Sequence, residues 1–289
     1  MSALGFSLVI AAAFCHAIWN FLVKRIVQRI DAGAELVWLF SLCSVILYLP
    51  LAAWLAWNAG GFTPAQMLFM AGSIALHSCY YLLLQQAYKK GDLSIIYPTA
   101  RASGPLLSVS MAVLFLGERL PLQAGVGGVI IVFGILMLTG QFARRSGESF
   151  APLSFGLAVG FVIGAYTVWD AHAVSALLIP PLLLDYVANL GRTILLSPLA
   201  WRRRGAARLL WRNHWRGVLG VALFSPLAYI LVLTALQFTP VVFVAPLREL
   251  SVLIAVLMGS FLLGEGNLRH RLSWACVILL GVFLLAASQ

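Results

Sequence analysis

Among the charged residues that lie inside long apolar segments of this chain, four are best suited to chemistry: Arg101, Asp170, Arg248 and Glu249. A charged group at the centre of a bilayer helix costs about 2.5–3.5 kcal/mol on insertion scales, so such groups normally face the interior of a helix bundle. A guanidinium group stays charged and can hold a carboxylate or phosphate by two hydrogen bonds. A buried carboxyl group can carry a proton near neutral pH or accept an ammonium group. These residues predict an internal site for a small charged molecule.

Polar residues also recur three or four positions apart on the apolar segments, and residues with this spacing share one face of a helix. A single Ser, Asn or Tyr more often joins two helices by a hydrogen bond, but rows on six or seven segments predict a central aqueous cavity. The rows are His16, Asn20 and Lys24; Ser73, His77, Tyr81 and Gln85; Tyr97, Arg101, Gly104 and Ser108; Tyr166 and Asp170; Asp185, Asn189 and Arg192; Ser225 and Tyr229; and Arg248 with Ser251. The candidate substrate-binding residues are Arg101, Arg248, Asp170, Glu249, His16, Trp19, Asn20, His77, Tyr81, Tyr97, Tyr166 and Tyr229.

Simpler explanations exist for some of these groups. Arg248 and Glu249 are adjacent and could neutralise their neighbours without binding a ligand. Asp185 and Arg192 could be a structural pair along one helix face. His77 lies near Cys79, but no other ligands have a matching metal-binding spacing, so we expect no metal and no cofactor.

Composition places these residues in a membrane. Of 289 residues, 62% are apolar and only 10% are Asp, Glu, Lys or Arg, against about 25% in ordinary soluble domains. A spanning helix needs about 20 mostly apolar residues. Such segments predict an all-α integral membrane protein with ten transmembrane helices, and the basic stretch 201–216 predicts an interfacial helix. The predicted spans are residues 4–23, 34–56, 67–87, 94–115, 123–142, 153–173, 176–199, 217–237, 241–262 and 272–287.

The net charge of +10 indicates orientation rather than affinity for nucleic acid. Fifteen of the nineteen Lys and Arg residues fall in the connections after odd-numbered spans, and only Arg119 falls in a connection on the opposite side. Basic residues accumulate in cytoplasmic loops. We therefore expect a multi-pass protein of the inner (plasma) membrane with both termini outside, and no nucleic-acid partner.

The chain resembles itself across its middle. The segments 101–118 (RASGPLLSVSMAVLFLGE) and 248–265 (RELSVLIAVLMGSFLLGE) are identical at seven of eighteen positions, and a proline precedes each initial arginine. Because the repeat contains five spans, an odd number, the two halves must insert with opposite topology. Inverted repeats are typical of secondary transporters, whose substrate site lies near the midplane between the halves. We assign residues 1–142 and 150–288 to two inverted five-helix repeats.

Small residues recur on the sixth predicted span, at Gly156, Gly160 and Gly164. Glycines four positions apart let two helices approach closely. We expect this ridge to serve packing inside the protein rather than a dimer face, and the chain to be a monomer or a weak homodimer.

Five short motifs follow one another along the chain: HAIWNFLVK (16–24), LGERL (116–120), AYTVWDA (165–171), APLRELS (245–251) and LGE (263–265). In this order, and with the internal repeat, they resemble the ten-helix EamA-type proteins of the drug/metabolite transporter superfamily over nearly the whole chain. The resemblance implies a central cavity surrounded by spans one to four and six to nine, with spans five and ten outside it. It also implies access that alternates as one half rocks against the other. Many family members have cytoplasmic termini, whereas the charge distribution here predicts the opposite.

The resemblance implies a carrier of small organic molecules, often an exporter of amino acids or other metabolites; some relatives move sugar phosphates, nucleotide sugars or lipid-linked sugars. We therefore expect a secondary active transporter in the lipid bilayer that exports a small polar or charged metabolite such as an amino acid, with Asp170 and Glu249 as candidates for proton coupling. The chain has no GxxxxGK[ST] loop of the ATPase type. A flippase for a lipid-linked sugar or phospholipid head group is an alternative. A membrane transferase has weaker support, because Asp185 offers one carboxylate where such enzymes cluster several, and we expect no enzyme.

Overall fold

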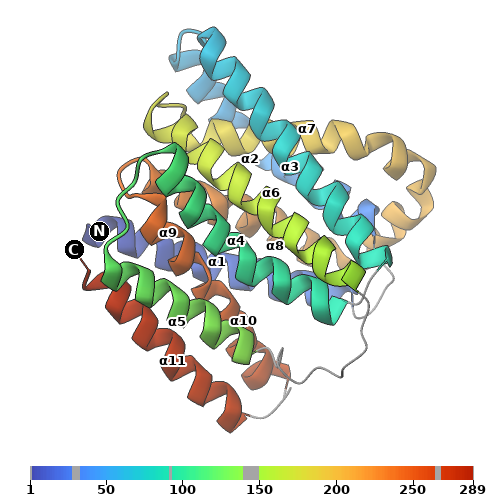
Figure 1. Cartoon of the computed structure of the whole chain (residues 1–289). Helices are drawn as coiled ribbons and strands as arrows, with labels where there is room; N and C mark the ends of the chain where they lie inside the picture. The colour runs from blue at the N-terminus through green and yellow to red at the C-terminus, as the bar shows by residue number, and fades with distance from the viewer. Residues whose placement is uncertain (1, 28–32, 91–92, 139–149, 264–267, 289) are drawn as a thin grey trace.

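The computed structural model describes residues 2–27, 33–90, 93–138, 150–263 and 268–288, and these residues form helices and connections with no β-strand among them. The two ends of the chain lie close together at one end of the bundle (Figure 1), as an even number of spans requires. The helices are α1 (Ala3–Val27), α2 (Ala34–Asn58), α3 (Pro64–Lys90), α4 (Leu93–Phe115), α5 (Leu122–Leu138), α6 (Phe150–Ser175), α7 (Pro181–Arg202), α8 (Arg204–Leu236), α9 (Val241–Arg248), α10 (Leu250–Leu263) and α11 (Leu268–Ala286).

The predicted all-helical fold with ten spans is confirmed. The helices α9 and α10 together form the ninth span, which is interrupted at Glu249, so eleven labelled helices correspond to ten predicted spans. Six helical stretches are long and apolar enough to cross a membrane, and α5 and the segment Leu272–Ala286 are shorter apolar helices. Many large apolar side chains on the outside of the bundle are exposed, including Leu122 and Phe283. Exposed apolar surface of this extent suits a protein that is surrounded by lipid.

The basic stretch between the seventh and eighth spans is helical, as predicted, and a kink separates it from the eighth span. The helix α8 runs for 33 residues and contains one residue with non-helical dihedral angles, His214 (φ −135°, ψ 19°). The chain therefore changes direction at His214, and the residues of α8 before it form a helical segment of their own between the seventh and eighth spans.

The main helix contacts run between the two halves of the chain rather than within them. The helix α1 corresponds to α6 in the repeat, and α3 corresponds to α8. Accordingly, α1 packs against α8, and α6 packs against α3 in the same way with the halves exchanged. Similarly, α4 packs against α6, and the ninth span packs against α1. The second and seventh spans (α2 and α7) and the fifth and tenth spans (α5 and α11) pack against their own counterparts. This pattern is that of an inverted repeat with a two-fold axis between the halves.

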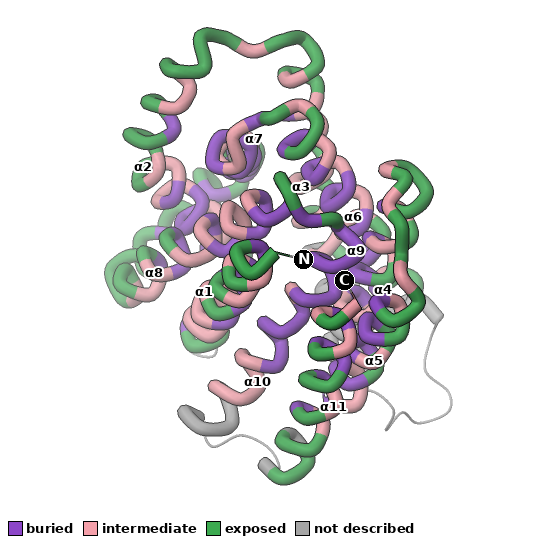
Figure 2. The backbone as a smooth tube through the Cα atoms, turned by 90° about the vertical axis from the view of Figure 1, so that its left-hand side faces the viewer, coloured by how far each residue is buried: buried purple, intermediate pink, exposed green. Residues whose placement is uncertain are grey.

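Burial is greatest around the ninth span. Figure 2 shows buried backbone concentrated around α9, and exposed backbone on the outer sides of α2, α8 and α11. Seven consecutive residues of α9, Val241–Leu247, are buried. Such continuous burial requires an apolar sequence on all faces, and this segment is VVFVAPL.

The glycines of α6 serve internal packing, as predicted. A Cβ atom at Gly160 would collide with the side chain of Ser103 on α4, and one at Gly164 would lie 3.1 Å from the Cβ of Leu107. The absence of side chains at these positions therefore lets α4 and α6 approach closely across the boundary between the halves.

The LGE motif that follows α4, at residues 116–118, has a structural role that the repeat alone did not indicate. Glu118 Oε1 accepts a hydrogen bond from the backbone N–H of Val241 (2.8 Å), and Oε2 accepts one from Val242 (2.9 Å). These two N–H groups lie in the first turn of α9, where a helix has no internal acceptors and carries partial positive charge. Glu118 of the first half therefore caps the ninth span of the second half.

We expect Glu118→Ala to lower the thermal stability of the detergent-solubilised protein, because two backbone N–H groups lose a charged acceptor. A hydrogen bond to a charged group contributes at most about 1.5–3 kcal/mol to the free energy of unfolding. Glu118→Gln keeps one side-chain oxygen and should give an intermediate loss. The measurement is the melting temperature, with the exposed neighbour variant Arg119→Ala as control. Equal melting temperatures for Glu118→Ala and the control would contradict the capping role.

Candidate functional site

A cavity of about 130 Å³ lies between the two halves. Its walls come from α1, α3, α4 and α6 to α10, and none of its described lining residues belongs to α2, α5 or α11. The expectation that the fifth and tenth spans lie outside the cavity therefore agrees with the structure. The second span differs from expectation, because it supports the wall from behind. The charged lining residues are Arg101, Asp185, Arg192, Arg248 and Glu249.

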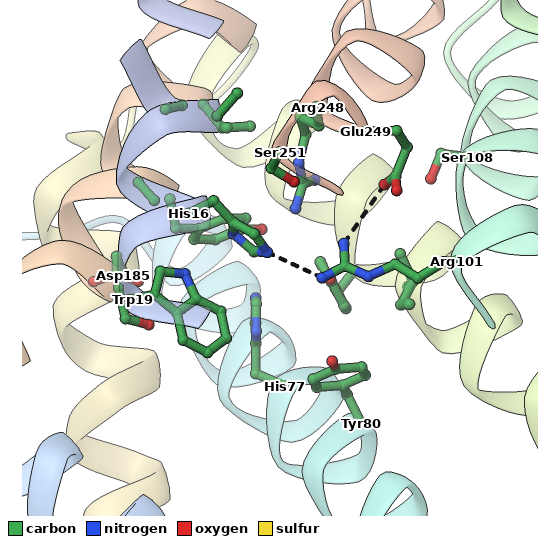
Figure 3. A pocket seen from close by; sticks show the side chains of 18 of the residues that line it. His16, Trp19, His77, Tyr80, Arg101, Ser108, Asp185, Arg248, Glu249 and Ser251 are labelled. Atoms are coloured by element: carbon green, nitrogen blue, oxygen red, sulfur yellow. Dashed lines mark hydrogen bonds and ion pairs between the residues drawn. The ribbon is translucent and has the colours of Figure 1, made fainter. Parts of the chain in front are cut away.

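Arg101 crosses the cavity from α4 towards α1 and the junction of α9 with α10 (Figure 3). Its Nη2 lies 3.0 Å from His16 Nε2, and its Nη1 lies 3.7 Å from Glu249 Oε1. A guanidinium group can only donate, so His16 Nε2 accepts and the imidazole ring is neutral in this arrangement. The separation from Glu249 is that of an ion pair without a short hydrogen bond. Glu249 Oε2 is buried and has no hydrogen-bond partner within the described part of the chain.

Arg248, the repeat counterpart of Arg101, lies at the end of α9. Its Nη1 donates a long hydrogen bond of 3.5 Å to Thr167 Oγ1 on α6. Its guanidinium carbon lies 5.6 Å from the centre of the Tyr229 ring, a cation–π distance. A guanidinium group has five N–H donors in a planar fork. Arg248 therefore retains donors for an additional oxygen ligand in the cavity.

Asp170 lies directly behind the wall of the cavity and its side chain is fully buried. Its Oδ2 accepts hydrogen bonds from Tyr229 Oη (2.6 Å) and from His77 Nε2 (2.9 Å). The His77 ring is stacked on Tyr166, with 4.4 Å between the ring centres. Asp170 Oδ1 is buried without a hydrogen-bond partner among the described residues. His77 and Tyr229 both line the cavity, so they connect Asp170 to it.

A second polar row follows α7. Asn189 Nδ2 donates to Asp185 Oδ2 (2.8 Å), and Arg192 donates to Asn189 Oδ1. Arg192 Nε also donates to Ser41 Oγ on α2 (2.9 Å), and its guanidinium carbon lies 4.3 Å from the centre of the Tyr81 ring. Asp185 and Arg192 are therefore joined through Asn189 and do not form the direct pair that their spacing suggested.

Most of the candidate residues predicted from the sequence meet in this one cavity. Asp170 lies behind its wall, and Asn20 is not among the lining residues, because its amide donates to the His16 carbonyl oxygen at 2.7 Å. The side chain of Tyr97 lies outside the described residues. The candidates that line the cavity are His16, Trp19, His77, Tyr81, Arg101, Tyr166, Tyr229, Arg248 and Glu249.

The α7 row and Tyr80 also line the cavity, although neither is among the candidate residues predicted from the sequence. The spacing of Asp185, Asn189 and Arg192 had marked one helix face, but a structural pair explained it equally well. Only the packing of α7 against α3 and α2 places that face in the cavity wall. Tyr80 precedes Tyr81 and had no partner at helical spacing.

Comparison with known proteins identifies the class of protein that this fold and cavity define. The EamA-like transporter family matches residues 3–140 and again residues 151–287. The chain therefore belongs to the EamA-like transporter family. It is a multi-pass membrane transporter of the drug/metabolite superfamily, a superfamily whose EamA members are transporters rather than enzymes.

Two individual likenesses accompany the family match. A solved structure titled "Crystal structure of protein" superposes with a TM-score of 0.75 at 13% sequence identity and covers 98% of this chain and 96% of its own chain, so it shares the fold. "Uncharacterized protein MJ1333.1" of Methanocaldococcus jannaschii is 41% identical over 58 residues. That alignment spans 20% of this chain and 42% of the relative.

We expect Tyr229 and Asp170 to be energetically coupled through their hydrogen bond. Tyr229→Phe and Asp170→Asn should each lower the melting temperature, and the double variant should lose less than the sum, because both changes weaken one bond of about 1.5–3 kcal/mol to a charged acceptor. Tyr81→Phe is the control, because it keeps the ring that faces Arg192 and its hydroxyl makes no hydrogen bond among the described residues. Strictly additive losses would contradict the coupling.

Proposed function

We propose that the protein is a secondary active transporter that exports a small metabolite with a carboxylate or phosphate group, such as an amino acid, by alternating access through the cavity. The observation that carries the proposal is the charge of the lining. Three arginines, Arg101, Arg192 and Arg248, face two carboxylates, Asp185 and Glu249. The wall thus has an excess of positive charge, which attracts an anionic group.

The pair Arg101 and Arg248 is the proposed anion site. The two residues occupy equivalent positions in the repeat and approach the cavity from different halves. A carboxylate or phosphate placed between them would receive donors from both halves, so its binding would favour one relative position of the halves. Such differential binding is what a carrier needs to link substrate occupancy to a conformational change.

Glu249 is proposed to pair with the Arg101 guanidinium when the substrate is absent. It lies at ion-pair distance from Arg101 without a short hydrogen bond, and it belongs to the second half of the chain. A substrate anion that binds Arg101 more closely would displace this carboxylate. Proton uptake by the displaced Glu249 would remove the cost of leaving it charged in a buried place.

Asp170 is proposed as a second proton-binding group. A substrate ammonium group cannot reach it without displacing His77 or Tyr229, whereas a proton can pass through the His77 ring. The position behind the wall therefore favours a role in coupling over direct substrate contact. The small size of the cavity and its many charged side chains favour a small metabolite over the lipid-linked head group of a flippase.

Transport by purified protein in liposomes tests these assignments. With a panel of labelled amino acids and organic acids and an imposed pH gradient, we expect at least one compound to accumulate, and Arg101→Ala and Arg248→Ala to reduce its flux at least tenfold. Arg119→Ala, outside the cavity, should transport normally. Asp170→Asn should exchange substrate across the membrane but no longer accumulate it in response to the gradient.

The outcomes separate the proposals. If no compound accumulates with the unmodified protein, secondary transport of such metabolites is wrong. If one accumulates and both arginine variants behave like the unmodified protein, transport stands and the anion site is wrong. If Asp170→Asn still accumulates substrate, Asp170 has no part in coupling.

We also propose an inner (plasma) membrane location with both termini outside, on the basis of the fifteen basic residues that follow odd-numbered spans. The close approach of the two chain ends in Figure 1 is consistent with any orientation in which they share a side. In spheroplasts, a protease added from outside should remove a C-terminal epitope tag while leaving a cytoplasmic marker intact. Protection of the tag until the membrane is permeabilised would reverse the orientation.

A further inference from the structure

The segment 201–216, WRRRGAARLLWRNHWR, is the most strongly charged surface of the described protein, and we call it the basic arm. It contains six arginines and three tryptophans and no acidic residue. It leads from the end of α7 into α8, at the edge of the bundle in Figure 1. The transport cavity uses none of these residues.

The arm is held firmly against the bundle by one of its faces. Ala207 and Leu210 are buried and belong to an apolar cluster with Ile26 of α1 and Leu36 of α2. Arg203 Nη1 lies 3.6 Å from Oε1 of the buried Glu35. The arm is therefore an ordered part of the fold, and its remaining residues are presented in fixed positions.

The opposite side of the arm presents a row of arginines to the outside. Arg204, Arg208 and Arg212 are four positions apart and all exposed, so they lie on one face of the helix. Like charges at this spacing repel one another in a helix. Within the described residues, no carboxylate forms an ion pair with Arg208 or Arg212, so the row lacks compensating negative charge from the protein itself.

Tryptophans lie beside this row. Trp211 and Trp215 are 40% and 44% exposed, and Trp201 at the start of the arm is 73% exposed. The Arg216 guanidinium lies over the Trp215 ring at 5.2 Å, and that of Arg204 lies 5.9 Å from the Trp201 ring centre. Exposed tryptophans at the ends of spanning helices are typical of the membrane–water interface, where the ring sits at the depth of the lipid head groups.

From this geometry we infer that the basic arm binds anionic phospholipid head groups of the adjacent leaflet, with Arg208 and Arg212 as the principal phosphate contacts. The tryptophans fix the depth of the arm, the buried face fixes its rotation, and the arginine row then meets the plane of the phosphates. A guanidinium fork matches phosphate oxygens in pairs. Basic residues close to a membrane surface are each worth about 1 kcal/mol in attraction to anionic lipid, or roughly fivefold in affinity.

The experiment compares lipid binding by the full chain in detergent, measured by native mass spectrometry. The probes are phosphatidylglycerol and phosphatidylcholine with identical acyl chains. We expect phosphatidylglycerol to bind at least tenfold more tightly than phosphatidylcholine. The double variant Arg208→Gln/Arg212→Gln should lose about tenfold or more of the phosphatidylglycerol affinity and keep its phosphatidylcholine affinity.

Two controls make the result specific to the arm. Arg119→Gln/Arg269→Gln removes the same number of charges elsewhere and should bind phosphatidylglycerol like the unmodified protein. Arg208→Lys/Arg212→Lys keeps the charges and should retain most of the affinity. An excess of soluble glycerol 3-phosphate should not displace the lipid, because the arm recognises phosphates arranged in a surface.

The inference is overturned if the two lipids bind equally, or if the glutamine variant of the arm behaves like the charge-matched control. Displacement by glycerol 3-phosphate would also overturn it and would indicate a site for soluble phosphates. None of these outcomes depends on whether the protein transports an amino acid or any other metabolite.

Discussion

The need to neutralise charge away from water governs the interior of this protein. Several buried ionisable groups find a partner on another helix, and in most of these pairs that helix belongs to the other half of the chain. Arg101 of the first half meets Glu249 of the second, and His77 of the first half meets Asp170 of the second. Arg192 of the second half bonds Ser41 of the first. The apolar faces could pack in several ways, but these polar contacts are satisfied in one register only.

The same contacts constrain how the halves can move. A rigid rotation of one half against the other must break bonds that would leave buried charges unpaired, at a cost that a ligand or a proton can offset. The close contacts at the glycines between α4 and α6 differ from these polar contacts. Two helices that pack through small residues stay in contact during a modest rotation. The polar contacts therefore determine which states are stable, and the small residues keep the helices together between those states.

Much of the architecture could be predicted from the sequence, because hydropathy and charge act over whole segments. The ten spans, the inverted repeat and the internal use of Gly160 all followed from spacing. The cavity was predicted less completely. Asp170 and Arg101 both have apolar neighbours along the chain, yet only Arg101 faces the cavity. Asp170 is buried because His77 and Tyr229, from two other helices, bond its carboxylate and cover it.

Two further features required the three-dimensional structure for a similar reason. Asp185, Asn189 and Arg192 share one face of α7 by their spacing, but only the packing of α7 against α2 and α3 places that face in the cavity wall. Glu118 meets the first turn of α9 although 123 residues separate it from Val241. No local sequence pattern predicts this contact, because it forms only when the fold brings two distant segments together.

The exchange of helix partners between the halves has a consequence for how such a protein could be assembled. A single half would leave its principal packing faces uncovered, and a second copy in the opposite orientation would cover them. The relative from Methanocaldococcus jannaschii aligns over 58 residues that make up 42% of its length, so that protein is only about half as long as this chain. Joining two half-length units in one polypeptide fixes their stoichiometry at one to one. It also frees each unit to diverge, which is how Glu249 can stand opposite Arg101 while its repeat counterpart is Ala102.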